Sequence, residues 1–384
     1  MKILHVASFA GNIGDIANHY GFRRWFKEFF KKEILWNEFE IRETFRGFKS
    51  FNEDFAHLAN SHDLLIFGGG GFFELWVEES PTGTSIAISK EVLEKIKIPI
   101  FFNGLGSCLE LGYSEKTISR FTHFIEYLSS RSDVFISFRN DGTKNDLIKL
   151  IPDLIDLQKI KVIPDGGFFA YYNKTQRNNK NNKTITIGIN IAKDMKEIRF
   201  PAKNLIDYQE YLTEMRKFLI SIAKDLRNLE IIFFPHIWSD LNIIGDILSI
   251  LPDDIRREKI IVSQLCCFKK HEDTIFNDYL KCDYILATRF HSNIVSLINH
   301  IPTIAMVNCN QIAGLYKEIG LEKFTLDTRK KNFSEDAINK LKYLQNNKEE
   351  FYEQNRITMN NIESDLEAIK TSLAKWFELV NINL

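Results

Sequence analysis

Short apolar runs alternate with longer segments of helical periodicity along the first 170 residues, and this alternation constrains the fold most. Each apolar run ends in glycine or polar residues, and no hairpin-type turn joins two runs. Parallel strands need a crossover connection, which is usually a helix. The pattern therefore predicts a parallel sheet with crossover helices. We expect its strands within residues 2–8, 63–71, 98–107, 134–141 and 161–172, the last as a short strand and turn.

Two of the segments between these runs have apolar residues at helical spacing. Residues 16–32 combine this spacing with basic residues, and residues 114–133 begin with Ser114, which has the hydroxyl of a typical N-cap. We expect the first helix to pack on the core. A helix lying at a membrane surface is the alternative, because the segment mixes aromatic and basic side chains.

An Asn- and Lys-rich stretch, residues 173–183, contains no large apolar residue and is the best candidate for a linker. After it the alternation of strands and helices resumes. A chain of 384 residues is long enough for two domains. We expect an α/β protein with two Rossmann-like doubly wound domains, at residues 1–172 and 184–333. A helical tail at residues 334–384 would pack across them. Ligands of such sheets bind outside the carboxyl ends of the strands, which here predicts a site in the cleft that the two domains face.

Charge and cysteine content argue against several classes of function. Lys and Arg number 50 and Asp and Glu 51, so the net charge gives no support for a nucleic-acid partner. The five cysteines have irregular spacing without a CxxC pair, which indicates neither a zinc site nor a disulfide framework. We expect no metal. The sequence contains no run of 18 apolar residues, so we expect no transmembrane helix. The expected location is the cytoplasm.

Glycine-rich loops follow several of the expected strands. Gly69 and Gly70 end one run and Gly104 ends another, and glycine lets the backbone approach a ligand and offer N–H groups to an anion. Neither loop has the spacing of a P-loop or of a dinucleotide fingerprint. The loop "GNIGD" supplies Asn12, Gly14 and Asp15 at the same edge of the sheet. Asp15 is either a helix cap or a group of the ligand site.

The segment 283–306, "DYILATRFHSNIVSLINHIPTIAM", ends an apolar run in Arg289 and His291. If both residues are extended, their spacing places them on one face. A helix that starts at Ser292 or Asn293 would add N-terminal amides, which favour an anion. This combination predicts a ligand site. Two further strand-end residues join it as candidates: His236 in "FFPHIWSD" and Arg139 in "SFRND", for which a surface ion pair is the alternative.

The order of these motifs resembles that of the polysaccharide pyruvyltransferase family over most of the chain. The matching pieces are "GNIGD", "LLIFGGGGFFE", "FFNGLGS", "ISFRNDGT", "VIPDGGFF", "FFPHIWSD" and "CDYILATRFHSNIVSLINHIPTIAM". The resemblance implies a two-domain fold of the GT-B type, with residues 1–172 on the acceptor side and residues 184–333 on the donor side. It also implies transfer of a pyruvyl group from phosphoenolpyruvate onto sugar hydroxyls, which forms a ketal on a bacterial surface polysaccharide or its precursor. The implied partners are phosphoenolpyruvate and a saccharide acceptor, either lipid-linked or nucleotide-activated, without a cofactor.

The resemblance also suggests roles for individual residues. Donor binding falls on Arg289 and His291, and we add Ser292, Asn293 and Arg139 as further candidates. Acid or base chemistry falls on His291, His236 or Asp15, because an imidazole titrates near neutral pH. The expected ligand-site loops contain Asn12, Gly14, Gly69, Gly70, Gly104 and Asp165. A lipid-linked acceptor would place the protein at the inner face of the membrane. The sequence does not determine the oligomeric state.

Three positions depart from the family pattern. Asn140 stands where the family commonly has Asp, Gly166 and Gly167 stand where it has Pro-Ala, and Asn310 and Gln311 stand where it often has a basic residue. Two other readings therefore stay open. One is a glycosyltransferase of the same shape that uses a nucleotide-sugar, and the other is a non-catalytic partner in polysaccharide assembly.

Overall fold

The computed structural model describes residues 1–31, 33–170, 184–265 and 272–382. The chain divides into two compact units. Unit 1 comprises residues 1–9, 18–169 and 361–384, and unit 2 comprises residues 10–17 and 170–360. Helices α1 and α16 contribute residues to both. The predicted linker, residues 173–183, lies outside the described residues.

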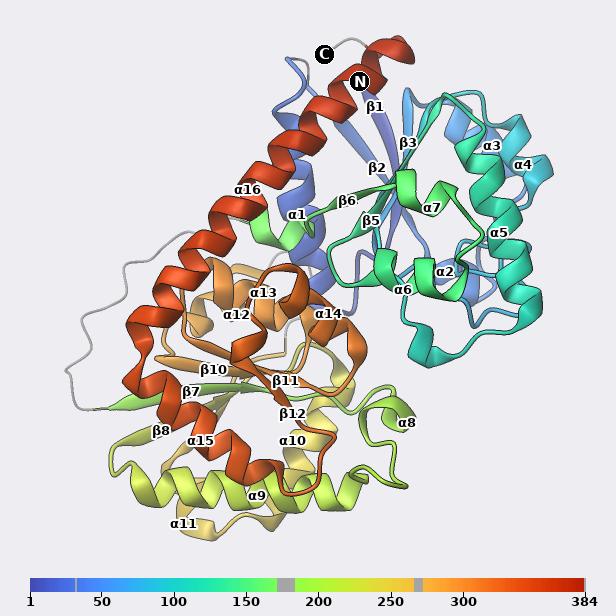
Figure 1. The fold of residues 1–384 in the computed structure, drawn as a ribbon. Coiled ribbons are helices and arrows are strands. Elements are labelled where there is room, and N and C mark those ends of the chain that lie inside the picture. Colours follow the sequence, from blue (N-terminus) through green and yellow to red (C-terminus); the bar gives the residue numbers. More distant parts are fainter. Residues whose placement is uncertain (32, 171–183, 266–271, 383–384) are drawn as a thin grey trace. The chain divides into compact units, whose positions relative to one another are not determined.

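Unit 1 is built on a six-stranded parallel sheet with the order β2-β1-β3-β4-β5-β6 (Figure 1). Its strands are β1 Lys2–Ala7, β2 Leu35–Glu40, β3 Leu64–Gly70, β4 Ile100–Leu105, β5 Val134–Arg139 and β6 Lys161–Ile163. Its helices are α1 Ile13–Lys27 (from Asn18 on), α2 Arg42–Phe45, α3 Glu53–Asn60, α4 Lys90–Lys95, α5 Glu115–Ser129, α6 Thr143–Leu150 and α7 Asp156–Lys159. The strand order reverses between β1 and β3. Ser114 caps α5, with Oγ accepting from the N–H of Thr117, which confirms the predicted cap.

Helices cover both faces of this sheet because alternate strand residues point to opposite sides. Leu65 and Phe67 of β3 pack with α3, α4 and α5 in one cluster. Leu64 and Ile66 of the same strand belong to a second cluster, with α1 and the C-terminal part of α16. Such two-sided burial explains why these parallel strands read as unbroken apolar runs.

The aromatic face of α1 is buried, which decides between the two readings of this helix. Phe22, Trp25 and Phe26 are between 0% and 3% exposed and pack in the second cluster of unit 1. They are therefore not available to a lipid surface, and the alternative of a membrane-lying first helix is wrong. No helix in the described part of the chain is long and apolar enough to cross a bilayer.

Unit 2 contains a second six-stranded parallel sheet, with the order β12-β11-β10-β7-β8-β9. Its strands are β7 Ile185–Asn190, β8 Leu229–Phe233, β9 Ile260–Val262, β10 Tyr284–Ala287, β11 Thr303–Val307 and β12 Thr325–Asp327. Its helices are α8 Lys196–Arg199, α9 Tyr208–Asp225, α10 Trp238–Ile250, α11 Asp253–Glu258, α12 Glu272–Tyr279, α13 Phe290–Ile298, α14 Asn310–Glu318 and α15 Phe333–Asn346. The strand order reverses between β7 and β10, as in dinucleotide-binding Rossmann folds.

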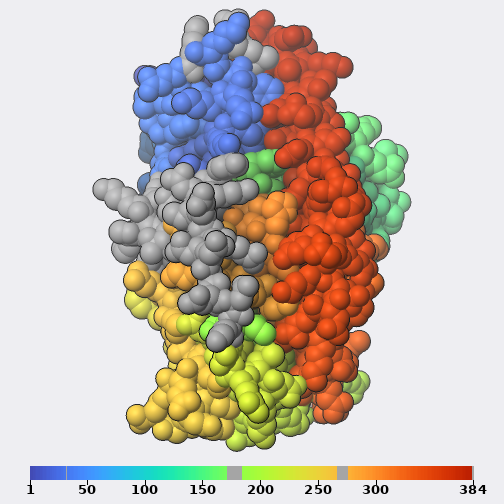
Figure 2. Space-filling view, turned by 90° about the vertical axis from the view of Figure 1, so that its left-hand side faces the viewer, coloured from blue at the N-terminus to red at the C-terminus, as the bar shows by residue number. Residues whose placement is uncertain are grey.

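The expected helical tail consists of α15 and the long helix α16, Lys348–Leu379. Helix α15 packs on α9 in unit 2. The last turns of α16 bury Leu373, Trp376 and Phe377 in unit 1. Figure 2 shows α16, coloured red, at the molecular surface on the face drawn. The fold class predicted from the sequence, two Rossmann-like domains with a helical tail, is confirmed.

Candidate functional site

The strand-order reversal in unit 2 brings together the ends of β7 and β10, where ligands of doubly wound sheets bind. Asn190 ends β7 and connects three strands at this point. Its Oδ1 accepts from the backbone N–H of Arg289 (2.9 Å), and its Nδ2 donates to the carbonyl of Phe234 (2.7 Å), just after β8. The ends of β8 and β10 are therefore both tied to the end of β7, next to Arg289.

Arg289 is enclosed by two carboxylates. Its Nε donates to Asp240 Oδ2 (2.7 Å) and its Nη2 to Asp194 Oδ1 (2.9 Å), with a further contact to each carboxylate. Asp240 is fully buried, and its Oδ2 also accepts from the backbone N–H of His236. The guanidinium was predicted to bind an anionic donor. In this structure four of its five N–H groups bind these two carboxylates.

Arg199 extends this cluster and balances its charge. It pairs with Asp194 at 3.4 Å and donates to Asn308 Oδ1 at 2.6 Å. Burial would lower the pKa of Arg289, but Asp240 and Asp194 raise it above its ordinary value. Burial would raise the pKa of Asp194, but Arg289 and Arg199 hold it below its ordinary value. Two positive and two negative groups therefore leave no net charge.

His291 lies in the first turn of α13, not in an extended segment. The helix begins at Phe290, with Arg289 as its N-cap residue, whereas the sequence suggested a start at Ser292 or Asn293. The predicted strand-like spacing of Arg289 and His291 is thus wrong, as is a helix start at Ser292 or Asn293. A helix N-terminus at this place is still present, and its first N–H groups have no acceptor within their own helix.

Gly14 lies against the imidazole of His291. A Cβ atom added at Gly14 would stand 2.5 Å from Nδ1 and 2.8 Å from the Cβ of His291. Gly14 belongs to α1, whose first turn packs into the core of unit 2 through Ile13 and Ala17. The "GNIGD" motif and the strand-end histidine, far apart in the sequence, therefore meet in one unit.

His236 is a buried neutral imidazole. Its Nε2 shares a hydrogen bond with the hydroxyl of Tyr279 (2.7 Å), which shares another with Ser292 Oγ (2.7 Å). Burial, together with the charges of Arg289 and His291, holds the pKa of His236 well below its ordinary value. The side chain is 0% exposed, so it reaches the strand-end site only through Tyr279 and Ser292.

The remaining candidates of unit 2 have local structural partners. The side-chain amide of Asn293 donates to the carbonyls of Ala287 and Arg289 and thereby closes the strand-to-helix turn. Its Oδ1 accepts from the hydroxyl of Tyr316. Asn12 Oδ1 accepts from the N–H of Gly14 (2.9 Å), so Asn12 rather than Asp15 caps α1. Asp15 lies inside the helix and its Oδ1 accepts from Asn12 Nδ2 (3.3 Å).

Unit 1 has its own polar network at the carboxyl ends of its strands. Arg139 ends β5, donates to Asp141 Oδ2 (2.8 Å) and stands 3.6 Å from Asp165 Oδ2. Asp165 also accepts from Asn18 Nδ2 (2.6 Å). Its N–H donates to Asn140 Oδ1 (2.9 Å), so the Asn140 departure takes part in this network. Arg139 is 4% exposed, so its ion pairs are buried and the alternative of a surface ion pair is wrong.

The glycines of unit 1 make room for Asn18 and for neighbouring strands. Gly69 faces Asn18, and a Cβ there would stand 2.8 Å from Nδ2. At Gly166 a Cβ would stand 2.2 Å from the carbonyl oxygen of Asn18, so no side chain fits. The departure at Gly166 is thus matched to its surroundings. Gly70 and Gly104 have φ values of 156° and 54°, and the second lies in the left-handed region that favours glycine.

Glu74 and Trp76, directly after the glycine-rich end of β3, were not singled out from the sequence. The indole N–H of Trp76 donates to Glu74 Oε2 (3.0 Å), while 45% of Trp76 remains exposed. Burial raises the pKa of Glu74 to about 7, against the lowering effects of Trp76 and Arg139. An acidic residue after a glycine loop, as in "GGGGFFE", was the available signal.

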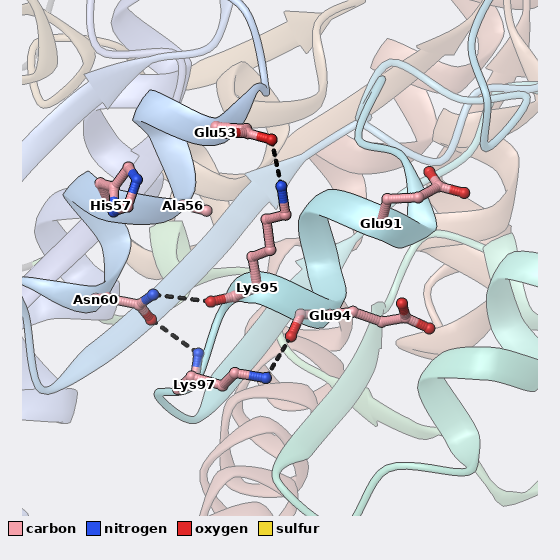
Figure 3. A pocket seen from close by; sticks show the side chains of 8 residues that line it. All are labelled: Glu53, Ala56, His57, Asn60, Glu91, Glu94, Lys95 and Lys97. Carbon is pink, nitrogen blue, oxygen red and sulfur yellow. Dashed lines mark hydrogen bonds and ion pairs between the residues drawn. The ribbon is translucent and has the colours of Figure 1, made fainter.

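Two hollows in unit 1 do not change this picture. One lies between α3 and α4, where Lys95 pairs with Glu53 and Asn60 hydrogen bonds to the backbone of Lys95 and Lys97 (Figure 3). It lies near the amino ends of the strands, because both helices lead into strands there. The other, beside Asn18 and Asp165, leaves no space for a molecule the size of water, whereas ligand pockets hold ~300 Å³ or more. No group of metal-binding side chains occurs among the described residues.

Comparisons with known proteins agree with the fold. The model of the polysaccharide pyruvyl transferase family matches residues 12–310. A UDP-GlcNAc 2-epimerase from Neisseria meningitidis, bound to UDP-GlcNAc, is 12% identical with a TM-score of 0.56, covering 98% of this chain and 100% of that one. A glycosyltransferase from Rickettsia africae is 11% identical with a TM-score of 0.56, covering 100% and 99%. At these identities the likeness concerns the fold, which is of the GT-B type. No curated protein matches the sequence.

Proposed function

We propose a reaction for this protein from one premise: the chain belongs to the polysaccharide pyruvyl transferase family. It transfers the pyruvyl group of phosphoenolpyruvate to two hydroxyls of a saccharide and forms a cyclic ketal on a bacterial surface polysaccharide or its precursor. The observation that carries the proposal is the placement of Arg289 and His291 where the strand order of the unit 2 sheet reverses.

The reaction balances without a cofactor. Two bonds form between C2 of the donor and acceptor oxygens, and the bond from C2 to the phosphate oxygen breaks. Of the two protons that leave the acceptor hydroxyls, one ends on the former methylene carbon and the other on phosphate. The protein must therefore bind an anionic donor and move protons at C3 and at the acceptor oxygens.

Donor binding in this proposal rests on α13 and His291, with Arg289 in support. The Arg289 cluster is neutral as a whole, because Asp194 and Asp240 offset its two guanidinium groups. The first-turn N–H groups of α13 offer an anion hydrogen bonds and the positive end of the helix dipole. His291 stands in that turn. Arg289 fixes the turn and adds one remaining N–H.

Proton transfer at the donor is assigned to His291 and not to His236. His291 keeps 6% of its surface exposed, whereas His236 has none and hydrogen bonds to Tyr279. His236 is then a positioning residue that holds Ser292 through Tyr279. Asp15 is not the helix cap, since Asn12 has that role, and it stays in this proposal as a second candidate for acid or base chemistry.

The test follows the fate of two donors. The protein is incubated with phosphoenolpyruvate or with UDP-GlcNAc and a panel of saccharides, and phosphate and UDP release are measured. We expect phosphate release that depends on the saccharide. Saccharide-dependent UDP release without phosphate release would instead identify a glycosyltransferase. Binding of phosphoenolpyruvate without turnover on any saccharide would favour a non-catalytic partner. A bound donor should also raise Tm, because a donor concentration of a hundred times Kd stabilises the folded protein by about 2.7 kcal/mol.

A further inference from the structure

The acceptor side of the proposed reaction is not explained by the residues of unit 2. We propose that Glu74 and Trp76 of unit 1 form the saccharide subsite: the Trp76 ring stacks on a sugar ring, and the Glu74 carboxylate takes the proton of the attacking hydroxyl. This inference rests on the proposed pyruvyl transfer and names the residues of its acceptor side.

Trp76 has the geometry of a sugar platform. Its indole N–H is used by Glu74 Oε2 at 3.0 Å, which fixes the ring, while 45% of the side chain remains exposed. An aromatic face that is both oriented and exposed offers apolar area at small entropic cost. Polar groups beside such a face then fix the ligand's orientation. The bonded carboxyl of Glu74 provides that group.

Glu74 is held at the carboxyl end of the sheet by backbone contacts. The N–H of Phe73 donates to the carbonyl of Gly106 (3.0 Å), and the N–H of Gly106 donates to the carbonyl of Gly70 (2.9 Å). The loop after β3 is therefore tied to the end of β4. A Cβ at Gly71 would stand 3.0 Å from Glu74 Oε1, so the glycine leaves the carboxyl its space.

The electrostatic surroundings give this carboxyl the properties of a base. Burial raises the pKa of Glu74 to about 7, while the Trp76 hydrogen bond and the charge of Arg139 lower it. A general base is most effective when its pKa lies near the working pH. Among acidic groups in the described residues with a raised pKa, Glu74 is the one placed at a strand end beside an exposed aromatic ring.

The step is a proton transfer coupled to bond formation. A proton added to C3 of the donor breaks the C2=C3 double bond and makes C2 electrophilic. The acceptor O–H bond breaks, its proton moves to Glu74, and the oxygen forms a bond to C2. The proton passes from Glu74 to the departing phosphate as the bond from C2 to the phosphate oxygen breaks. The second hydroxyl then bonds to C2, and its proton replaces the one given to C3. No oxidant or reductant is needed.

Four variants test the subsite with phosphoenolpyruvate and the p-nitrophenyl glycosides of glucose, galactose, N-acetylglucosamine and N-acetylmannosamine. Trp76→Ala should raise the KM of the best glycoside about three- to tenfold and leave the KM of phosphoenolpyruvate unchanged. Glu74→Gln should lower kcat about 100-fold or more. Glu79→Gln, an exposed carboxylate of the same loop, and Phe48→Ala, an exposed aromatic residue of unit 1, should change neither.

The pH profile separates a base from a merely structural carboxyl. In the wild type, kcat/KM for the glycoside should rise with pH through an apparent pKa near 7. Glu74→Gln should remove this rise. Trp76→Phe should keep the stacking but move the rise to higher pH, because the hydrogen bond that lowers the pKa of Glu74 is lost.

The outcomes distinguish this subsite from the reaction itself. If the wild type releases no phosphate with any glycoside, the proposed function fails and the subsite fails with it. If the wild type is active but the acceptor KM of Trp76→Ala and the pH profile of Glu74→Gln match the wild type, the subsite alone is refuted.

Discussion

The imidazole of His291 occupies the space that a side chain at Gly14 would take, with Nδ1 only 2.5 Å from an added Cβ atom. His291 stands in the first turn of α13 and Gly14 in the first turn of α1. Because the Cβ of His291 is also within 2.8 Å, a rotation of the ring alone cannot relieve the contact. Gly14 therefore fixes where His291 can lie.

Gly14→Ala should displace His291 and weaken phosphoenolpyruvate binding at least tenfold, as measured by calorimetry. Gly245→Ala is the matched control, because Gly245 also lies in a helix and an added Cβ there meets nothing within 4 Å. Alanine is favoured over glycine in a helix interior by roughly 0.5–1 kcal/mol. The control should thus gain stability and keep donor binding. Equal donor affinity in both variants would show that His291 is not positioned by Gly14.

Arg289→Ala should destabilise the protein by about 3–5 kcal/mol in urea unfolding, because it leaves the fully buried Asp240 without its partner. Loss of donor binding in this variant would therefore not identify Arg289 as a ligand-binding residue. Arg356→Ala, which removes an exposed ion pair with Glu353, should cost no more than about 1 kcal/mol. Similar decreases in the free energy of unfolding in the two variants would contradict the buried pairing of Arg289.

Stability should decrease with falling pH through His236. Its folded-state pKa is depressed, mainly by burial, so the unfolded chain binds a proton at a pH where the folded protein does not. The stability it contributes is fully present above the unfolded pKa of about 6.5 and is lost progressively below it. Urea unfolding at pH values from about 5 to about 8, in steps of about one unit, measures how the free energy of unfolding changes with pH. His236→Gln should flatten it, whereas His57→Gln, on the exposed side of α3, should not. Parallel slopes in His236→Gln and the wild type would count against a buried neutral His236.

Phe377→Ala should cost about 3–5 kcal/mol, because the fully buried ring packs against Phe26 and Phe30 in unit 1. Leu379→Ala lies on the same helix and is 64% exposed, so its cost should be within about 0.5 kcal/mol. The measurement is chemical unfolding of both variants. A small loss in Phe377→Ala would mean that the last turns of α16 do not stabilise unit 1.

The fold was predictable because its strands are buried on both faces and therefore read as short apolar runs. Ser114 could be identified as a cap because its partner, the N–H of Thr117, is three residues away. The start of α13 was misplaced because Arg289, Phe290 and His291 carry no capping signal. Arg289 itself is the N-cap residue and makes no side-chain cap.

The site was predictable in its parts but not in its pairings. Arg289, His291 and Gly14 are marked by strand ends and glycine loops. The carboxylates that enclose Arg289 lie 49 and 95 residues away, and their pairing depends on how the strands of the sheet are ordered. For the same reason the buried state of His236 could not be read from "FFPHIWSD". Its partner Tyr279 is the last residue of α12 and lies 43 residues away in the sequence.

Pyruvyl transfer itself is tested most directly by mass spectrometry of saccharides incubated with the protein and phosphoenolpyruvate. The account predicts an acceptor whose mass increases by that of pyruvic acid less one water, with one phosphate released for each product molecule. Absence of this product across the saccharide panel, from folded protein that binds phosphoenolpyruvate, would contradict it.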